Sequence, residues 1–192
     1  RGEQVLYLVP EIALTTQLTD RLRRAFGARL GVYHSRFSDA ERVEIWNNLL
    51  QGDGYQVVIG ARSALFLPFE KLGLVIVDEE HDTSYKQTDS APRYQARNAA
   101  VVLASLHGAK VILGSATPAI ESYSNALTGK FGLVELPTRY ADIEKPRIIT
   151  VDLTEAYRKK QMTGHLSDTL IEQMRETLAA GEQVILFQNR RG

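Results

Sequence analysis

Short apolar runs alternate with longer stretches of helical periodicity along most of the chain. Each run is rich in β-branched residues, and we predict strands in QVLYLVP (4–10), GVYHS (31–35), QVVIGA (56–61), GLVIVDEE (73–80), KVILGSAT (110–117), PRIITVDL (146–153) and QVILFQN (183–189). Strands that are apolar on both faces and separated by amphipathic helices are typical of a parallel sheet covered by helices on both faces. The pattern therefore predicts an α/β fold.

Two apolar stripes at helical spacing lie between the first strands. They consist of Leu14, Leu18, Leu22 and Ala25, and of Val43, Trp46 and Leu50. Residues three and four apart share one face of a helix, so each stripe predicts an amphipathic helix. We expect both stripes, Trp46 included, to belong to the core and not to contact a ligand.

The segment LPTRYADIEKPR has neither a helical nor a strand period, and it carries two prolines and mixed charge. We interpret residues 137–147 as a linker that follows a first domain over 1–136. Beyond it, 148–192 contain the opening units of a second domain, including a helix over Ser167–Ala180 that Gly181 ends.

Composition limits the remaining possibilities. The chain has 192 residues, 44% of them hydrophobic, which is enough to bury a core. It has no cysteine, so disulfides and thiolate metal sites are excluded within it. No window approaches the roughly 18 uncharged apolar residues of a membrane span, and no signal-peptide pattern opens the chain, so we expect an intracellular protein.

The charges balance, with 23 Lys and Arg against 23 Asp and Glu. Any contact with nucleic acid must therefore come from local clusters and not from an overall basic field. Basic clusters occur at RLRR (21–24), YRKK (157–160) and NRR (189–191), and each is equally explained as solvated surface.

The strand at 73–80 ends in an acidic group, VDEEHD, with one histidine among four carboxylates. In doubly wound folds the ligand crevice lies beyond the carboxyl ends of the strands. An aspartate at this place can hold Mg²⁺ through water, and a neighbouring glutamate can deprotonate an attacking water. This is the Walker B arrangement of nucleotide hydrolases, although an ordinary strand end with solvated acids has the same letters.

Further motifs narrow the choice: LVPEIALTTQ (8–17), YHS (33–35), IGARSALFLPF (59–69), VDEEHDTSYKQ (77–87), PRYQARNAA (92–100), GSATPAIES (114–122) and VILFQNRRG (184–192). GSAT or DEEH alone marks only superfamily-two helicases, whereas the whole set resembles the PriA family of primosomal replication-restart helicases. The resemblance spans nearly the whole chain. Asn98 departs from the aspartate expected there, which leaves one local salt bridge in question.

The resemblance implies a RecA-like sheet, the start of a second RecA-like domain, and ATP-driven 3′-to-5′ movement along single-stranded DNA that reloads the replicative helicase at stalled forks. It assigns Mg²⁺ to Asp78 and water activation to Glu79. The implied catalytic residues are Asp78, Glu79, Glu80 and His81, and the implied coupling residues are Ser115, Ala116 and Thr117. We expect the imidazole to exchange hydrogen bonds with the two hydroxyls, while Thr117 also suits a helix N-cap before Pro118.

The segment from Tyr85 to Arg97 has neither helical nor strand period, and it interleaves aromatic rings with cations, which suits unpaired bases and their phosphates. It resembles the aromatic-rich loop that reports DNA occupancy to the ATP site in this family. The alternative interpretation of this segment is a surface loop with one buried tyrosine. For Arg62, which follows an earlier strand, the alternative to a DNA contact is an ion pair with a carboxylate. The implied DNA-binding residues are Thr15, Gln17, Arg62, Ser63, Tyr85, Lys86, Arg93, Tyr94 and Arg97. We expect the loop from Asp82 to Arg97 to be mobile without DNA, because no apolar period pins it to the core.

The sequence lacks a G-x-x-x-x-G-K-[ST] phosphate loop; TGKFG at 128–132 has Phe131 where a hydroxyl belongs, and we interpret Gly129 as a helix C-cap. The family has its phosphate loop before VLYLVPE, and a cysteine-rich zinc region and an arginine finger after NRRG. We therefore expect the chain alone to be inactive as an ATPase, and its parent to use ATP, Mg²⁺ and, beyond Gly192, Zn²⁺. The implied partners are single-stranded and forked DNA, primosome proteins and single-strand-binding proteins in the bacterial cytoplasm at the nucleoid, with no membrane.

Three alternatives remain. A metal-dependent nuclease or hydrolase would use the acids directly, but no H-E-x-x-H motif or second suitably spaced acidic group supports it. A non-catalytic DNA-binding module would leave the acids without a chemical role. Another superfamily-two DNA translocase would share the broader motifs.

Overall fold

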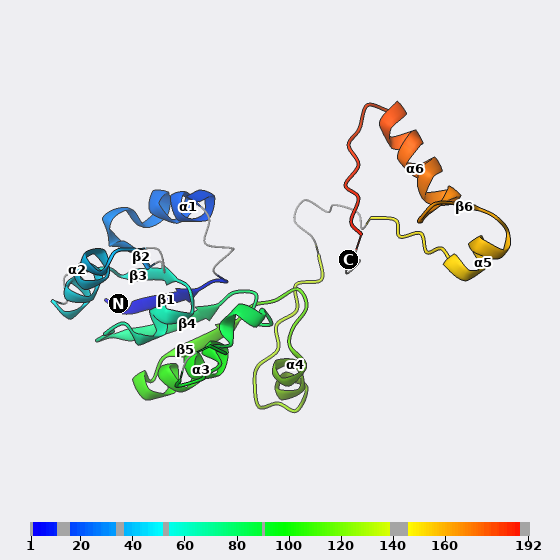
Figure 1. Ribbon diagram of the computed structural model, residues 1–192. Coiled ribbons are helices and arrows are strands. Elements are labelled where there is room, and N and C mark those ends of the chain that lie inside the picture. The colour runs from blue at the N-terminus through cyan, green and yellow to red at the C-terminus, as the bar shows by residue number, and fades with distance from the viewer. Residues whose placement is uncertain are drawn as a thin grey trace. The chain divides into compact units, whose positions relative to one another are not determined.

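The computed structural model describes residues 2–10, 16–33, 37–51, 54–89, 91–138 and 146–188. The chain divides into two compact units, Arg1–Val134 and Glu135–Gly192, which we describe separately (Figure 1).

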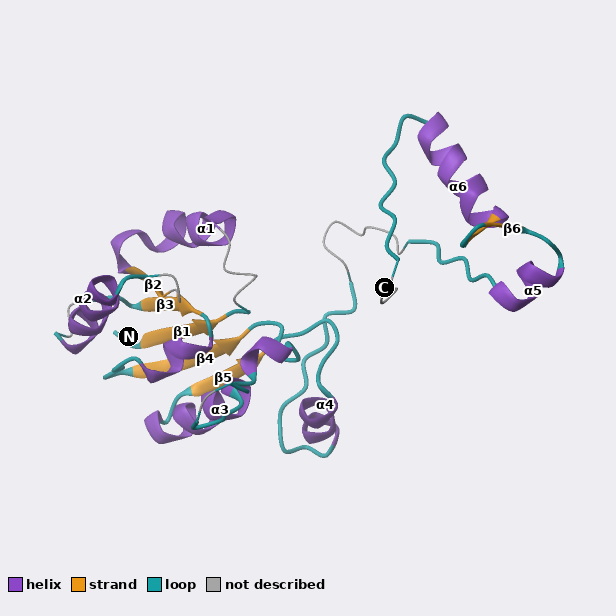
Figure 2. Ribbon diagram, viewed as in Figure 1, coloured by secondary structure: helices purple, strands orange, loops and turns teal. Residues whose placement is uncertain are grey.

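Within the described part of the first unit, five parallel strands form one sheet in the order β2-β3-β1-β4-β5 (Figure 2). The strands are β1 (Gln4–Leu8), β2 (Leu30–Tyr33), β3 (Val57–Gly60), β4 (Leu72–Val77) and β5 (Lys110–Leu113). In the register, Leu8 lies opposite both Gly60 and Val77, so the carboxyl ends of three strands meet at one edge. The α/β prediction and the first five predicted strands are confirmed.

Helices cover both faces of the sheet, as predicted. The covering helices are α1 (Thr16–Phe26), α2 (Asp39–Leu50) and α3 (Ala96–His107). Helix α4 (Ile120–Leu127) has no buried residue, and the 3-10 turns are η2 (Gly27–Arg29), η3 (Arg62–Phe66) and η4 (Thr83–Tyr85). Leu18, Leu22 and Phe26 of α1 pack on one face, against a cluster around Ile59. Helices α2 and α3 pack with η3 on the other face, in the larger cluster around Leu6. Figure 1 shows α1 and α3 on opposite sides of the sheet.

Helix α2 turns a different face to the core from the predicted one. Ile45 and Leu49 are buried, whereas Val43, Trp46 and Leu50 are 56%, 43% and 50% exposed. The helix carries two apolar stripes, and only the contact with the sheet decides which is buried. The prediction that Trp46 belongs to the core is therefore wrong. Of the predicted α1 stripe, Leu14 lies outside the described residues and Ala25 is exposed.

The second unit contains α5 (Leu153–Arg158), an antiparallel pair of two-residue strands, β6 (Met162–Thr163) and β7 (Leu166–Ser167), and α6 (Asp168–Ala179). Ser167 caps α6 by accepting the Leu170 N–H at 3.3 Å, and Gly181 follows with φ +75°. The strands predicted at 146–153 and 183–189 do not form among the described residues. An apolar run becomes a strand only beside a pairing partner, and the described residues of this unit provide none. Across the described chain, no helix combines the length and apolarity needed to cross a bilayer.

Candidate functional site

Asp78 lies where β4 ends between its two neighbouring strands. Its N–H donates to Leu8 O at 2.9 Å, and Gly114 N–H donates to Val77 O at 2.9 Å. The carboxylate is held from two directions, because Oδ2 accepts the Tyr7 hydroxyl at 2.9 Å and Oδ1 accepts the Glu79 N–H at 3.0 Å. Burial, with the Asp78 bond and charge, raises the pKa of Tyr7 to about 12, so the phenol stays a donor.

The residues after Asp78 form a tight turn, which we call the acid turn (78–81). Glu79 has φ +45°, a left-handed conformation that costs free energy for any residue with a Cβ and that clusters at functional sites. Glu80 N–H donates to Gly114 O at 3.0 Å and fixes the turn against the end of β5. The Glu79 side chain is exposed, with Oε2 3.6 Å from His81 Nδ1, so it can accept a proton from a nearby water.

Glu80 is buried, with 1% of its surface exposed. Its carboxylate accepts hydrogen bonds from Arg97 Nη1 at 3.0 Å, from the Ala119 N–H at 2.6 Å and from Ser122 Oγ at 2.8 Å. Helix α4 has no N-cap bond from Ala119 itself, so Glu80 supplies the missing acceptor from another part of the chain. The acid turn is thereby joined to α3 and α4.

His81 contacts both hydroxyls of the segment after β5. Nδ1 lies 2.7 Å from Ser115 Oγ and Nε2 lies 3.3 Å from Thr117 Oγ1. Thr117 N–H also donates to Ser115 Oγ at 3.0 Å. Thr117 is not the N-cap of α4, because the helix begins at Ile120 after Ala119. The exposed Ala116 lies between the two hydroxyl residues.

The donor set at this edge fits a hydrated magnesium ion. Among the described residues, no three His, Asp or Glu side chains gather as a direct metal site. Mg²⁺ keeps several of its waters in most protein sites and needs only one or two carboxylates. Asp78 is a partly exposed, oriented carboxylate of this kind.

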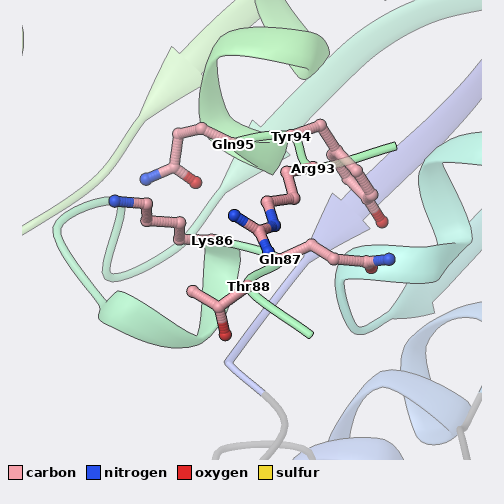
Figure 3. A pocket seen from close by; sticks show the side chains of 6 residues that line it. All are labelled: Lys86, Gln87, Thr88, Arg93, Tyr94 and Gln95. Atoms are coloured by element: carbon pink, nitrogen blue, oxygen red, sulfur yellow. The ribbon is translucent and has the colours of Figure 1, made fainter. Parts of the chain in front are cut away.

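The acid turn continues into a segment with two arms, loop 82–95. Asp82 caps η4 by accepting the Ser84 N–H at 2.7 Å, and this contact lowers the pKa of the Asp82 carboxyl. The arms pair where Lys86 lies opposite Gln95 and Gln87 N–H donates to Tyr94 O at 2.9 Å. Between them is a cavity of about 350 Å³ lined by Lys86, Gln87, Thr88, Arg93, Tyr94 and Gln95. In Figure 3, the Lys86 and Gln95 side chains extend to one side, and those of Tyr94 and Gln87 to the other.

Tyr85 and Arg97 pin this segment to the core. Tyr85 is fully buried and its hydroxyl donates to Asp78 O at 2.7 Å, while Arg97 is 7% exposed and paired with Glu80. Arg97 Nε also donates to the uncharged amide oxygen Oδ1 of Asn98 at 3.2 Å, at the position where we expected an aspartate. The expectation that nothing pins the loop is therefore wrong. In this conformation neither Tyr85 nor Arg97 presents its ring or guanidinium to a DNA strand.

The other predicted DNA-contacting residues are placed as follows. Lys86 and Arg93 are exposed, and Tyr94 is half-buried with its ring edge against Phe66, the centroids 5.2 Å apart. Arg62 Nη1 donates to two carbonyls of loop 82–95, so the carboxylate pairing considered for it is not its contact here. Gln17 and Ser63 are exposed, while Thr15 lies outside the described residues.

Comparison with known proteins now decides the family. Residues 1–126 match the model of the DEAD/DEAH box helicases, which is more than half of the chain. The chain belongs to the DEAD/DEAH box helicase family. It is 44% identical over 191 residues to the replication restart protein PriA of Chlamydia trachomatis and 42% identical over 192 residues to that of Bacillus subtilis. These alignments cover all of this chain but 25% and 24% of the relatives, so the chain spans about a quarter of their length.

Among solved structures, the C-terminal domain of Dbp5 from S. cerevisiae aligns with this chain at 16% identity and a TM-score of 0.43. The alignment covers 81% of this chain and 80% of the Dbp5 chain. A likeness this low adds nothing to the fold assignment.

Several residues of this candidate site carry no recognisable sequence signal. Tyr7 is an ordinary strand residue by pattern, and only the pairing of β1 with β4 brings its hydroxyl to Asp78. Ser122 reaches Glu80 from the first turn of α4. Gln87, Thr88 and Gln95 line the cavity because the two arms pair, which no local period predicts.

Proposed function

We propose that the chain forms the acid turn and the DNA-sensing loop of an ATP-dependent helicase that moves 3′ to 5′ along single-stranded DNA and restarts stalled replication forks. One observation carries the proposal: the acid turn runs directly into loop 82–95, and the Tyr85 hydroxyl donates to the Asp78 carbonyl at 2.7 Å. A carboxylate suited to Mg²⁺ and a cavity with two cations thereby belong to one connected segment.

In the proposed reaction, Asp78 would hold Mg²⁺ through water, and Glu79 would accept the proton of the water that attacks the terminal phosphate of ATP. When bound, Mg²⁺ would supply positive charge to offset the negative charge that develops on the phosphate oxygens. The exposure of Glu79 and its place one residue after Asp78 support this role. Tyr7 orients the Asp78 carboxylate through its hydroxyl.

Glu80 and His81 act as the link between the nucleotide site and the segment Ser115–Thr117. The buried Glu80 holds the start of α4, and the imidazole contacts the Ser115 and Thr117 hydroxyls. A shift of the acid turn on nucleotide binding would therefore move α4 with it. These contacts support a coupling role for Glu80 in place of direct contact with the attacking water.

DNA contact is assigned to the exposed part of loop 82–95. Lys86 and Arg93 bind phosphates, and the half-buried Tyr94 presents the accessible part of its ring to a base. Gln17, Ser63 and, outside the described residues, Thr15 add polar contacts from neighbouring strand ends. Tyr85 and Arg97 act from inside the loop, because both are buried.

The full-length protein is proposed to use ATP and Mg²⁺, and Zn²⁺ bound beyond Gly192. Its partners are single-stranded and forked DNA, primosome proteins and single-strand-binding proteins, at the nucleoid in the bacterial cytoplasm. The 42–44% identity to replication restart proteins supports the use of ATP, Mg²⁺ and DNA, whereas the zinc, the protein partners and the location rest on the family resemblance alone.

A second candidate is a non-catalytic DNA-binding module, at least for the chain by itself. The absence of a G-x-x-x-x-G-K-[ST] loop from its sequence favours this candidate, because the backbone cradle and the lysine for the phosphates are then lacking. Another superfamily-two DNA translocase would have the same acid turn, but its substrate would be a different DNA structure.

The test is ATP hydrolysis by the full-length protein with and without single-stranded DNA. The proposal expects Mg²⁺-dependent hydrolysis that DNA stimulates, and strand displacement from a forked substrate. Cleavage of DNA with Mg²⁺ and no ATP would support a nuclease, and DNA binding without hydrolysis would support the non-catalytic module.

A further inference from the structure

Arg62 is placed to bind the main chain of loop 82–95. It is the first residue of η3, two residues after β3 ends at Gly60, and its Nη1 donates to Ser84 O at 3.0 Å and to Lys86 O at 2.9 Å. Both acceptors are backbone carbonyls, so the contact fixes the path of the chain whatever side chains the loop carries. A hydrogen bond from a charged donor is among the stronger ones.

The start of η3 is itself fixed by close packing at Gly60. A Cβ on Gly60 would lie 2.7 Å from the Ala64 Cβ and 2.8 Å from Tyr33 O, so only glycine fits. Val9 N–H donates to Gly60 O at 3.0 Å, which ties this point to the end of β1. Arg62 therefore projects from a rigid part of the sheet edge.

The second arm of the loop rests on the same short turn. Phe66, at the end of η3, meets the Tyr94 ring edge-on, with centroids 5.2 Å and planes 79° apart. Burial raises the pKa of Tyr94, while the nearby Arg62 charge lowers it, which places the guanidinium beside this ring as well. Both arms of the cavity thus depend on η3, one through Arg62 and the other through Phe66.

We propose that Arg62 is a positioning residue, a latch that holds loop 82–95 in the shape that forms the cavity, and that it does not act mainly as a phosphate contact. The DNA consequence of this latch rests on the proposed function, whereas the latch itself is a property of the chain. Losing Arg62 leaves the first arm held by the buried Tyr85 and by its pairing with the second arm, so the main chain that carries Lys86 is held less firmly at the cavity.

Hydrogen–deuterium exchange on the 192-residue chain tests the latch without any ligand. Arg62→Ala should speed exchange in peptides covering 83–95 by on the order of tenfold, the factor expected for losing about 1.4 kcal/mol of local stability. Peptides of β1 and β4 should exchange as in wild type and serve as an internal control. Arg62→Met keeps the aliphatic stem and removes the donors, so it provides the same test if the alanine variant unfolds. Exchange at the wild-type rate in 83–95 would overturn the latch.

Binding of a single-stranded oligonucleotide at several salt concentrations separates the latch from a phosphate contact. Arg93→Ala should reduce the slope of log affinity against log salt by about 0.7, the value for one lost phosphate contact on a single strand. Arg62→Ala should weaken binding with nearly the wild-type slope. If Arg62→Ala also reduced the salt slope by about 0.7 and left exchange in 83–95 unchanged, Arg62 would be a phosphate contact and the proposal would be overturned. If the wild-type chain binds no DNA, the DNA-contact assignment falls, and the exchange result still decides the latch.

Discussion

Glu79 is the residue on which the chemical part of the account depends. It is exposed, it follows the oriented Asp78, and its backbone holds a left-handed conformation. In the full-length protein, Glu79→Gln should keep nucleotide binding and cut hydrolysis by about 10²-fold or more, the usual scale for losing a general base. The measurement is ATPase rate beside nucleotide affinity, with the exposed Glu70→Gln as a matched control. Near wild-type turnover in Glu79→Gln would remove this role.

Because Tyr85 is buried, its substitution by Phe and by Ala should lower the free energy of unfolding by different amounts. Tyr85→Phe removes only the hydrogen bond to Asp78 O and should lower the free energy of unfolding by about 0.5–1.5 kcal/mol. Tyr85→Ala also empties a fully buried site and should cost roughly 3–5 kcal/mol. Urea unfolding of the chain measures both. Equal, small losses would mean that Tyr85 is not buried in solution.

At the scale of elements, the buried pair of Glu80 and Arg97 joins the acid turn to α3 and α4. Glu80→Ala leaves the Arg97 guanidinium without its buried carboxylate partner and the Ala119 N–H without its acceptor, so it should lower the free energy of unfolding by roughly 3–5 kcal/mol. Glu121→Ala removes an exposed carboxylate 3.9 Å from the same guanidinium and should change stability by less than about 0.5 kcal/mol. Chemical unfolding of both variants makes the comparison, and a similar loss in both would contradict the assigned burial.

The five strands of the first unit were predictable because a parallel strand covered on both faces is a continuous apolar run, as in LGLVIV of β4. The same kind of run at 146–153 and 183–189 gave a wrong prediction, because the described residues of the second unit offer it no pairing partner. The place of Asp78 followed from the same rule. Side-chain partners were not predictable: the face of α2 depended on which of two stripes met the sheet, and the cap of α4 came from Glu80, about forty residues away in sequence. Tyr85 was assigned to DNA because its neighbours in the sequence are polar. Only the structure shows that its ring belongs to the core cluster and that its hydroxyl donates to Asp78 O.

At the scale of the whole molecule, the chain by itself has the acid turn but no phosphate-binding loop in its sequence. It should therefore bind ATP only weakly and hydrolyse none, because the backbone N–H groups and the lysine that hold the phosphates are missing. Titration calorimetry with ATP and Mg²⁺ checks this expectation. Submicromolar affinity would contradict it.

The central claim is that loop 82–95 reports DNA to the acid turn, and the most direct test is a DNA titration of the ATPase rate in the full-length protein. Arg93→Ala removes an exposed cation that lines the cavity. The account predicts that it raises the single-stranded DNA concentration for half-stimulation roughly tenfold or more, while the DNA-free rate and the melting temperature stay close to wild type. An unchanged half-stimulating concentration, or a uniform loss of activity and stability, would contradict the account.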